Sequence, residues 1–166
     1  MNDSCQRLWD AFLASGLRWA DEAAEKGFVS WQFGLGPEMA DRLLGRVMNG
    51  RKRATAGSLS AYEMEGEPVP EVGEYSVILD GAGAGRCIIR TSRVDILPFD
   101  EVGSEHATLE GDDDPSLERW REVHWRFFQR EAEEFGSEEP RPDLLVVCER
   151  FEVVYPLEVA DPGRAE

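Results

Sequence analysis

The order of helix-like and strand-like segments most constrains the fold of this 166-residue chain. Apolar residues recur at helical spacing over residues 3–27, 36–50 and about 115–134. Strand patterns occupy residues 52–59, 75–79 and 86–97, and the apolar run 144–154 is typical of a central strand. Because these segments do not alternate as regular βαβ units, the pattern favours an α+β barrel or sheet over a doubly wound fold.

Glycine and proline predict where these segments end or bend. Gly16 is a point where the first helix can kink or split, and Gly50 closes the second helix as a left-handed cap. The glycine-rich stretch 80–85 predicts a hairpin turn between two strands. Residues 99–114 are strongly acidic and predict short helical turns at most, before Pro115 opens the long helix.

Length and composition predict a single-domain cytoplasmic protein, as a monomer or homodimer. No apolar run reaches the roughly 18 residues of a membrane-spanning helix. The first residues lack the basic start and long apolar stretch of an export signal. Cys5, Cys87 and Cys148 lie far apart in the sequence, which is typical of reduced thiols.

The charge is large and unevenly distributed. The net charge of −16 opposes binding of a long nucleic-acid duplex, because such binders usually present a basic surface. Residues 100–139 hold fourteen acidic side chains and four arginines, whereas residues 42–53 hold five basic side chains and no acidic one. We therefore expect an anion or an electron-rich base to bind near residues 42–53.

The segment Gly50-Arg-Lys-Arg-Ala-Thr55 within this basic stretch is the sharpest local signal. Sixteen of the eighteen basic residues are arginine, so Lys52, between two arginines, is either a chance lysine or one that supplies something other than charge alone. An amine from Lys52 and a hydroxyl from Thr55 can meet only if the chain bends, because residues i and i+3 lie on opposite faces of a regular strand. The alternative is a basic turn that is simply solvated.

Several further segments occur in a characteristic order after this motif: 72–80, 98–102, 117–124 and 146–151. Together with the glycine-x-lysine-x-x-threonine pattern of residues 50–55, they resemble the ASCH domain family of the PUA-like superfamily, in its longer bacterial branch. The resemblance implies a PUA-like mixed β-barrel over residues 31–155 with flanking helices, among them the long helix near 115–134. Residues 1–30 would then be an N-terminal helical extension, and residues 156–166 a flexible tail.

The resemblance also implies an activity. Small members of the family hydrolyse the amide of N4-acylated cytidine with a lysine, a threonine and a glutamate. Lys52 and Thr55 match the first two, and Glu110 matches the third because it follows the pair His106-Ala107. Thr55 would be the nucleophile, Lys52 its base and Glu110 a group that handles protons. Such a lysine must be partly neutral, which burial and neighbouring arginines would promote.

Other residues are candidates for substrate binding. Trp120 and His124 lie one helical turn apart, so they can stack on a base, although their place in an apolar stripe equally fits core packing. Arg90 interrupts an apolar strand and needs either a ligand or a carboxylate such as Glu149. The remaining candidates are Arg51, Arg53, Ser58 and Tyr62.

Two alternative functions follow from the same features. Relatives in the longer branch cleave RNA with divalent metal, and the run 112–114 could recruit Mg²⁺ or Mn²⁺ to single-stranded RNA, although Asp114 is also a candidate helix cap. Three adjacent loop carboxylates are, however, typically solvent-facing, and we assign no metal ligands. The second alternative is a non-catalytic RNA-binding or coregulator module in which Lys52 contacts phosphate. A neutral nucleoside feels least repulsion from an acidic protein, which favours the hydrolase.

Overall fold

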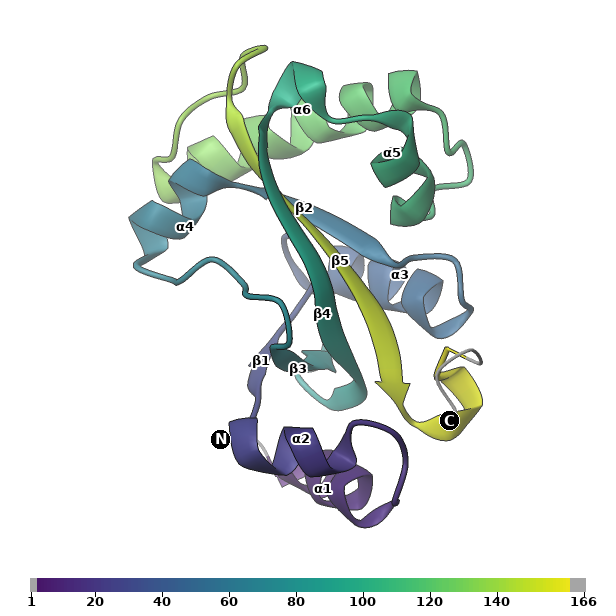
Figure 1. Ribbon diagram of the computed structural model, residues 1–166. Coiled ribbons are helices and arrows are strands. Elements are labelled where there is room, and N and C mark those ends of the chain that lie inside the picture. Colours follow the sequence, from purple (N-terminus) through teal and green to yellow (C-terminus); the bar gives the residue numbers. More distant parts are fainter. Residues whose placement is uncertain (1–2, 162–166) are drawn as a thin grey trace. The chain divides into compact units, whose positions relative to one another are not determined.

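The computed structural model describes residues 3–161, which combine helices with one mixed β-sheet (Figure 1). The helices among these residues are α1 Asp3–Ala14, α2 Ala20–Lys26, α3 Pro37–Met48, α4 Leu59–Glu65, α5 Ser104–Glu110 and α6 Leu117–Phe135, with the 3₁₀ turns η1 Phe99–Glu101 and η2 Leu157–Val159. The strands are β1 Val29–Trp31, β2 Ala54–Ser58, β3 Tyr75–Leu79, β4 Gly85–Pro98 and β5 Leu145–Tyr155. The predicted α+β class of PUA-like type is confirmed. None of the described helices is both long and apolar enough to cross a bilayer.

The strands are arranged in the order β1-β3-β4-β5-β2, so β2 is an edge strand. β3 and β4 form the antiparallel hairpin that the glycine-rich stretch predicts. β1 runs parallel to β3, and β2 runs antiparallel to β5. The described residues form two compact units, one of residues 3–50, 72–92 and 151–161 and the other of residues 51–71 and 93–150.

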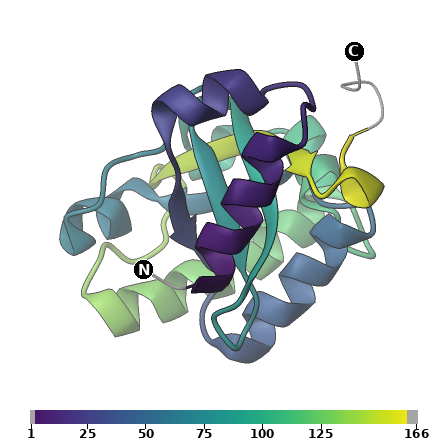
Figure 2. The same cartoon turned by 90° about the horizontal axis from the view of Figure 1, so that it is seen from below.

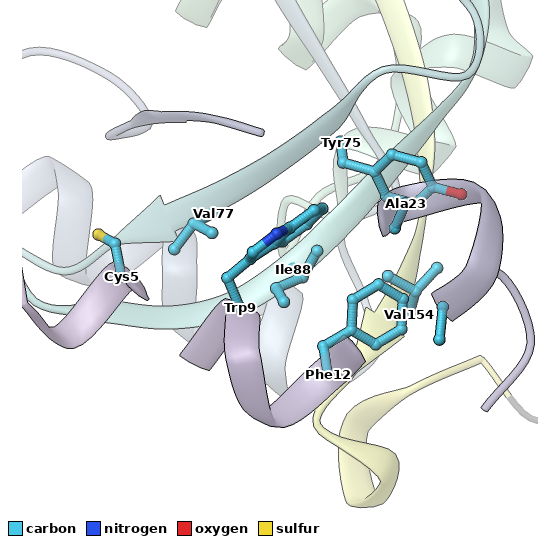
Figure 3. Packing of buried hydrophobic residues seen from close by; sticks show 9 residues of the cluster. Cys5, Trp9, Phe12, Ala23, Tyr75, Val77, Ile88 and Val154 are labelled. Atoms are coloured by element: carbon cyan, nitrogen blue, oxygen red, sulfur yellow. The ribbon is translucent and has the colours of Figure 1, made fainter. Parts of the chain in front are cut away.

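In the first unit, α1 and α2 cover one face of β3 and β4 (Figure 2). Trp9 and Phe12 of α1 pack against Tyr75 of β3, with ring centroids 5.9 and 6.3 Å from the tyrosine ring (Figure 3). The predicted helix 3–27 is divided here into two helices. Gly16 has a φ of 71° and Trp19 a φ of 79°, and such left-handed residues cannot continue a helix.

The other face of the same strands packs against α3. Leu44 and Val47 of α3 contact Ile78 of β3 and Ile89 of β4. Consecutive residues of β3, from Tyr75 to Ile78, are therefore all buried. The reason is tertiary, because helices lie on both faces of the hairpin.

The second unit carries the helices that follow β2 and β4. The apolar face of α6 packs through Phe128 against Leu144, Val146 and Phe99. The acidic region 99–114 is more regular than predicted, because it contains η1 and the seven-residue α5. The sequence patterns did not predict α4, which Ser58 caps at the end of β2.

Two predictions concern the chain ends and the thiols. Of the predicted tail 156–166, residues 157–159 form η2 and residues 162–166 lie outside the described residues. Cys5, Cys87 and Cys148 are buried free thiols. They pack in separate clusters of the core, so each thiol serves as a small apolar group.

Candidate active site

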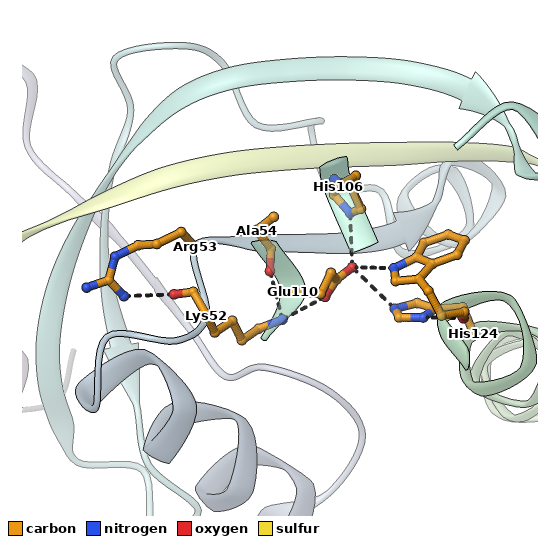
Figure 4. Close-up of polar contacts among 7 residues, drawn as sticks. Lys52, Arg53, Ala54, His106, Glu110 and His124 are labelled. Atoms are coloured by element: carbon orange, nitrogen blue, oxygen red, sulfur yellow. Dashed lines mark hydrogen bonds and ion pairs between the residues drawn. The ribbon is translucent and has the colours of Figure 1, made fainter. Parts of the chain in front are cut away.

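Lys52 is buried just before β2, in the segment of residues 51–53 that follows the turn at Gly50. The φ of Gly50 is 88°, as the predicted left-handed glycine requires, although the cap residue of α3 is Asn49. Only 2% of Lys52 is exposed. Its Nζ donates hydrogen bonds of 2.7 Å to the carbonyl oxygen of Ala54 and to Oε1 of Glu110 (Figure 4). The amine of Lys52, a residue of the predicted motif, thus forms a buried salt bridge with Glu110.

Glu110 reaches Lys52 because the end of α5 packs closely against residues 51–53. The backbone N–H of Arg53 donates to the carbonyl of Leu109 at 2.7 Å. Gly111 ends α5 with a φ of 80°, and a Cβ at this position would lie 2.7 Å from the carbonyl oxygen of Arg51. Only glycine permits both this backbone conformation and this approach, so Gly111 sets the distance between Glu110 and Lys52.

The second carboxylate oxygen of Glu110 contacts three ring nitrogens. Nε1 of Trp120 donates to Oε2 at 3.1 Å, and Nε2 of His106 lies 3.0 Å from the same oxygen. Nε2 of His124 lies 3.3 Å away. The rings of Trp120 and His124 stack with centroids 4.1 Å apart. We call Lys52 and these four residues the Glu110 cage (Figure 4).

The charges of the cage hold Glu110 as a carboxylate. Burial alone raises the pKa of Glu110. The positive charges of Lys52 and His124, together with the hydrogen bond from His106, more than offset burial, so the pKa lies well below its ordinary value. Lys52 therefore faces an anion.

This arrangement corrects the expectation that neighbouring arginines crowd the Lys52 amine. Arg51 is exposed and pairs with Asp113 at 2.9 Å. The guanidinium of Arg53 donates to the backbone carbonyl of Lys52 at 2.7 Å, not toward the amine. The charged group in contact with the amine is Glu110, with which Lys52 forms a buried ion pair.

Thr55 lies next to this ion pair, half-buried in β2 and opposite Glu149 of β5. A carbonyl oxygen lies about 2.8 Å from the next Cα, so the 2.7 Å bond to Ala54 places Nζ at most about 5.5 Å from the Thr55 Cα. The chain is not yet a strand at Lys52, and β2 begins at Ala54. Because Lys52 precedes the strand, the amine and the hydroxyl are not held on opposite faces of a regular strand.

Comparison with known proteins identifies the family. The ASCH domain model matches residues 29–155. The chain belongs to the ASCH domain family. Its PUA-like fold is often implied in RNA binding.

Two solved structures are similar to this ASCH domain along almost the whole chain. The crystal structure of an ASCH domain from Lactobacillus crispatus JV V101 matches with a TM-score of 0.83 at 32% identity, covering 94% of this chain and 97% of that chain. A protein from Enterococcus faecalis V583 matches with a TM-score of 0.77 at 38% identity, covering 93% of this chain and 90% of that chain. No curated protein matches the sequence.

Ser58 and Tyr62 lie further along β2 and α4 of the ASCH domain. Oγ of Ser58 accepts from the N–H of Ala61 and donates to the buried Glu131 of α6 at 2.8 Å. Burial raises the pKa of Glu131. A Cβ on Gly57 would lie 3.3 Å from the Tyr62 ring, so this glycine lets the ring pack on β2. Ser58 therefore links α4 to α6.

Arg90 lies in the first unit and has a different partner from the one predicted. Its Nε pairs with Glu22 of α2 at 3.2 Å, rather than with Glu149. Its guanidinium carbon lies 3.9 Å from the ring centroid of Trp19, and the hydroxyl of Tyr75 also donates to Glu22 at 2.7 Å. These contacts satisfy the charge of Arg90 within its own unit.

The structure places Trp120 in the core, as one of the two interpretations of its pattern predicts. Trp120 packs in the core of the second unit, with 4% of its surface exposed, and also donates to Glu110. His106 also belongs to the cage, although the sequence pattern pointed to it only as part of the His106-Ala107 pair that locates Glu110. Its spacing of four residues from Glu110 on one helix was the available signal.

The carboxylates of residues 112–114 contact backbone and side-chain groups of the protein itself. Asp113 pairs with Arg51, and Asp114 accepts from the N–H of Ser116 at 3.1 Å. The predicted cap at Asp114 is wrong, because Ser116 caps α6 by accepting from the N–H of Arg119. Residues 3–161 contain no group of three or more histidine, cysteine, aspartate or glutamate side chains arranged to hold a metal ion.

Proposed function

We propose that this ASCH protein hydrolyses the acyl amide of an N4-acylated cytidine, using Lys52, Thr55 and Glu110. The observation that carries the proposal is the buried contact of 2.7 Å between Nζ of Lys52 and Oε1 of Glu110, beside a half-buried threonine. Burying an ion pair is often less favourable than burying apolar side chains of the same volume. A function in proton transfer gives a reason for placing these charges here.

The ion pair provides a path for the proton that a threonine nucleophile must lose. A proton first moves from Nζ of Lys52 to Glu110 along their hydrogen bond, which leaves a neutral amine and a neutral acid. The amine then takes the hydroxyl proton of Thr55 as Oγ bonds to the acyl carbon. When the carbon–nitrogen bond breaks, the N4 amine of cytidine takes a proton from Lys52, and Glu110 returns its proton to Lys52.

Water completes the reaction through the same groups. Lys52 again passes a proton to Glu110 and then removes a proton from water as the water attacks the acyl-threonine ester. Thr55 Oγ leaves with the proton that Lys52 took from water, and Glu110 returns its proton to Lys52. The products are cytidine and a carboxylic acid, so amide and water are consumed in equal amounts. The net charge of −16 supports a small neutral substrate, because long-range repulsion acts much more strongly on a polyphosphate.

The test measures the release of cytidine and acetate from N4-acetylcytidine by chromatography. Lys52→Arg keeps the positive charge but should lower kcat/KM by roughly 10²–10⁴-fold, because arginine does not act as a base. Thr55→Ala and Glu110→Gln should lower kcat/KM by similar factors. Lys26→Arg is the matched control, because Lys26 is half-exposed in the other unit and should leave the rate unchanged.

Two further measurements separate this proposal from its competitors. Intact-mass spectrometry after rapid acid quench should detect one acetyl group on the protein and none on Thr55→Ala. Labelled single-stranded RNA should stay intact with and without a chelator. Chelator-sensitive RNA fragments, with the nucleoside untouched, would instead identify a metal-dependent ribonuclease. RNA binding without any product would identify a binding module.

A further inference from the structure

The two ring nitrogens of His124 have contacts that determine where its protons lie. Nδ1 lies 2.9 Å from the backbone carbonyl oxygen of Trp120. A carbonyl oxygen only accepts, so Nδ1 must carry a proton. Nε2 lies 3.3 Å from Oε2 of Glu110. A neutral ring protonated at Nδ1 would turn the lone pair of Nε2 toward a carboxylate oxygen, which also accepts.

One additional proton resolves this conflict. It can lie on Nε2, which makes His124 an imidazolium ion, or on Glu110, which then donates to Nε2. The ammonium of Lys52 on Oε1 favours the first arrangement for the resting cage, because it stabilises Glu110 as an anion. Lys52 and His124 then place two positive charges on opposite oxygens of one carboxylate.

The other two residues that contact Oε2, Trp120 and His106, do not need an additional proton. The N–H of Trp120 cannot titrate, and the contact of His106 requires only one proton on Nε2. His124 is also partly accessible, with 14% of its side chain exposed, whereas 6% of the His106 side chain is exposed. Protons can therefore exchange between solvent and His124.

We propose that His124 is a positioning residue that gates proton transfer from Lys52 to Glu110, an inference that rests on the proposed function. With the imidazolium present, Glu110 accepts from two cations and is a poor proton acceptor. After His124 loses the proton on Nε2, one positive charge fewer stabilises the Glu110 carboxylate. The Lys52 proton can then move along its hydrogen bond onto Oε1 of Glu110, and the neutral amine becomes the base for Thr55.

Among the charged and titratable groups around His124, one is placed to control the charge of its ring. Glu110 and His106 face it from α5, and Lys52 contacts the same carboxylate from the segment before β2. Glu131 lies two turns further along α6, where its charge acts on His124, but its own hydrogen bonds go to Ser58. Of these groups, Glu110 is the one in direct contact with Nε2.

The first test measures protonation and does not depend on turnover. The chain has two histidines, so long-range ¹H–¹⁵N spectra of the rings contain two spin systems, which His106→Gln assigns. Between pH 5 and 9 we expect His124 to lose the proton on Nε2 in one step and to keep the one on Nδ1. A His124 with a single proton throughout would overturn the proposal.

The second test follows the rate. The kcat/KM for N4-acetylcytidine should rise about tenfold per pH unit below the His124 step and level off above it. His124→Gln, whose side-chain amide always donates to Oε2, should abolish this rise and lower kcat/KM at least about tenfold at high pH. His106→Gln should keep the step. A pH profile unchanged in His124→Gln would refute the gate.

The two tests distinguish failure of the gate from failure of the proposed hydrolase. If the spectra show the expected protons but no acylated nucleoside is cleaved, the charge state stands and the hydrolase proposal fails. If cleavage depends on Lys52 and Thr55 but the spectra show one proton on His124 at every pH, the hydrolase stands and the gate fails.

Discussion

Replacing Lys52 by methionine tests the energetics of the Glu110 cage directly. Methionine has a similar length, so the substitution removes the charge while largely filling the space. It leaves the Glu110 carboxylate, of which 7% is exposed, without its cationic partner. Breaking a buried ion pair by removing one charge typically costs about 3–5 kcal/mol.

The remaining contacts of Glu110 set the expected value within this range. Oε2 still faces His106, Trp120 and His124, so the carboxylate keeps its other hydrogen bonds. We therefore expect a loss of about 3 kcal/mol in the free energy of unfolding, near the lower end of the range. For a chain of this size that corresponds to a fall in Tm of roughly 6–12 °C.

The assay measures unfolding in urea at pH 7, with tryptophan fluorescence as the signal. Lys26→Met is the matched control, because Lys26 and Glu22 are half-exposed and 3.9 Å apart, so it should lose less than about 1 kcal/mol. The double variant with Glu110→Gln should lose at least about 1.5 kcal/mol less than the sum of the two single losses. If Lys52→Met is no less stable than Lys26→Met, the ion pair is not buried as described.

Three other predictions follow from the same unit. Because folding lowers the pKa of Glu110 below its ordinary value of 4.5, its stabilisation is present above that pH and lost in stronger acid; the advantage of wild type over Glu110→Gln in urea should shrink between pH 5 and pH 2. Gly111→Ala should lose about 2–3 kcal/mol through its left-handed φ and backbone clash, whereas Gly103→Ala, with nothing within 4 Å, should change little in the same assay. Ser58→Ala should lose about 2–3 kcal/mol by calorimetry, because it removes a helix cap and the hydroxyl donor to buried Glu131; a loss below about 0.5 kcal/mol would contradict that linkage.

Local patterns in the sequence were enough to locate the motif and the regular elements around it. The spacing of apolar residues predicted α6, and the apolar run predicted β5. Gly50 marked the turn before Lys52, and its positive φ is confirmed. These predictions succeed because helix periodicity, turn chemistry and continuous burial are written in neighbouring residues.

Errors arose where a residue's surroundings come from distant segments. The strand pattern of residues 75–79 does not show that α1 and α3 bury both faces of the hairpin. The sequence leaves Arg90 with either a ligand or a carboxylate such as Glu149 as partner, whereas the fold places Glu22 beside it. With 18 basic and 34 acidic residues, many pairings are compatible with the sequence, and packing selects among them.

The sequence by itself determined that an amine and a hydroxyl follow a glycine turn at the start of a strand. The tertiary structure decided the charge around that amine, because Glu110 lies 58 residues away and reaches it only through the close approach of Gly111. It also decided that His106, Trp120 and His124 converge on the same carboxylate. A charge is set by the groups within a few ångströms, and distance along the chain carries no such information.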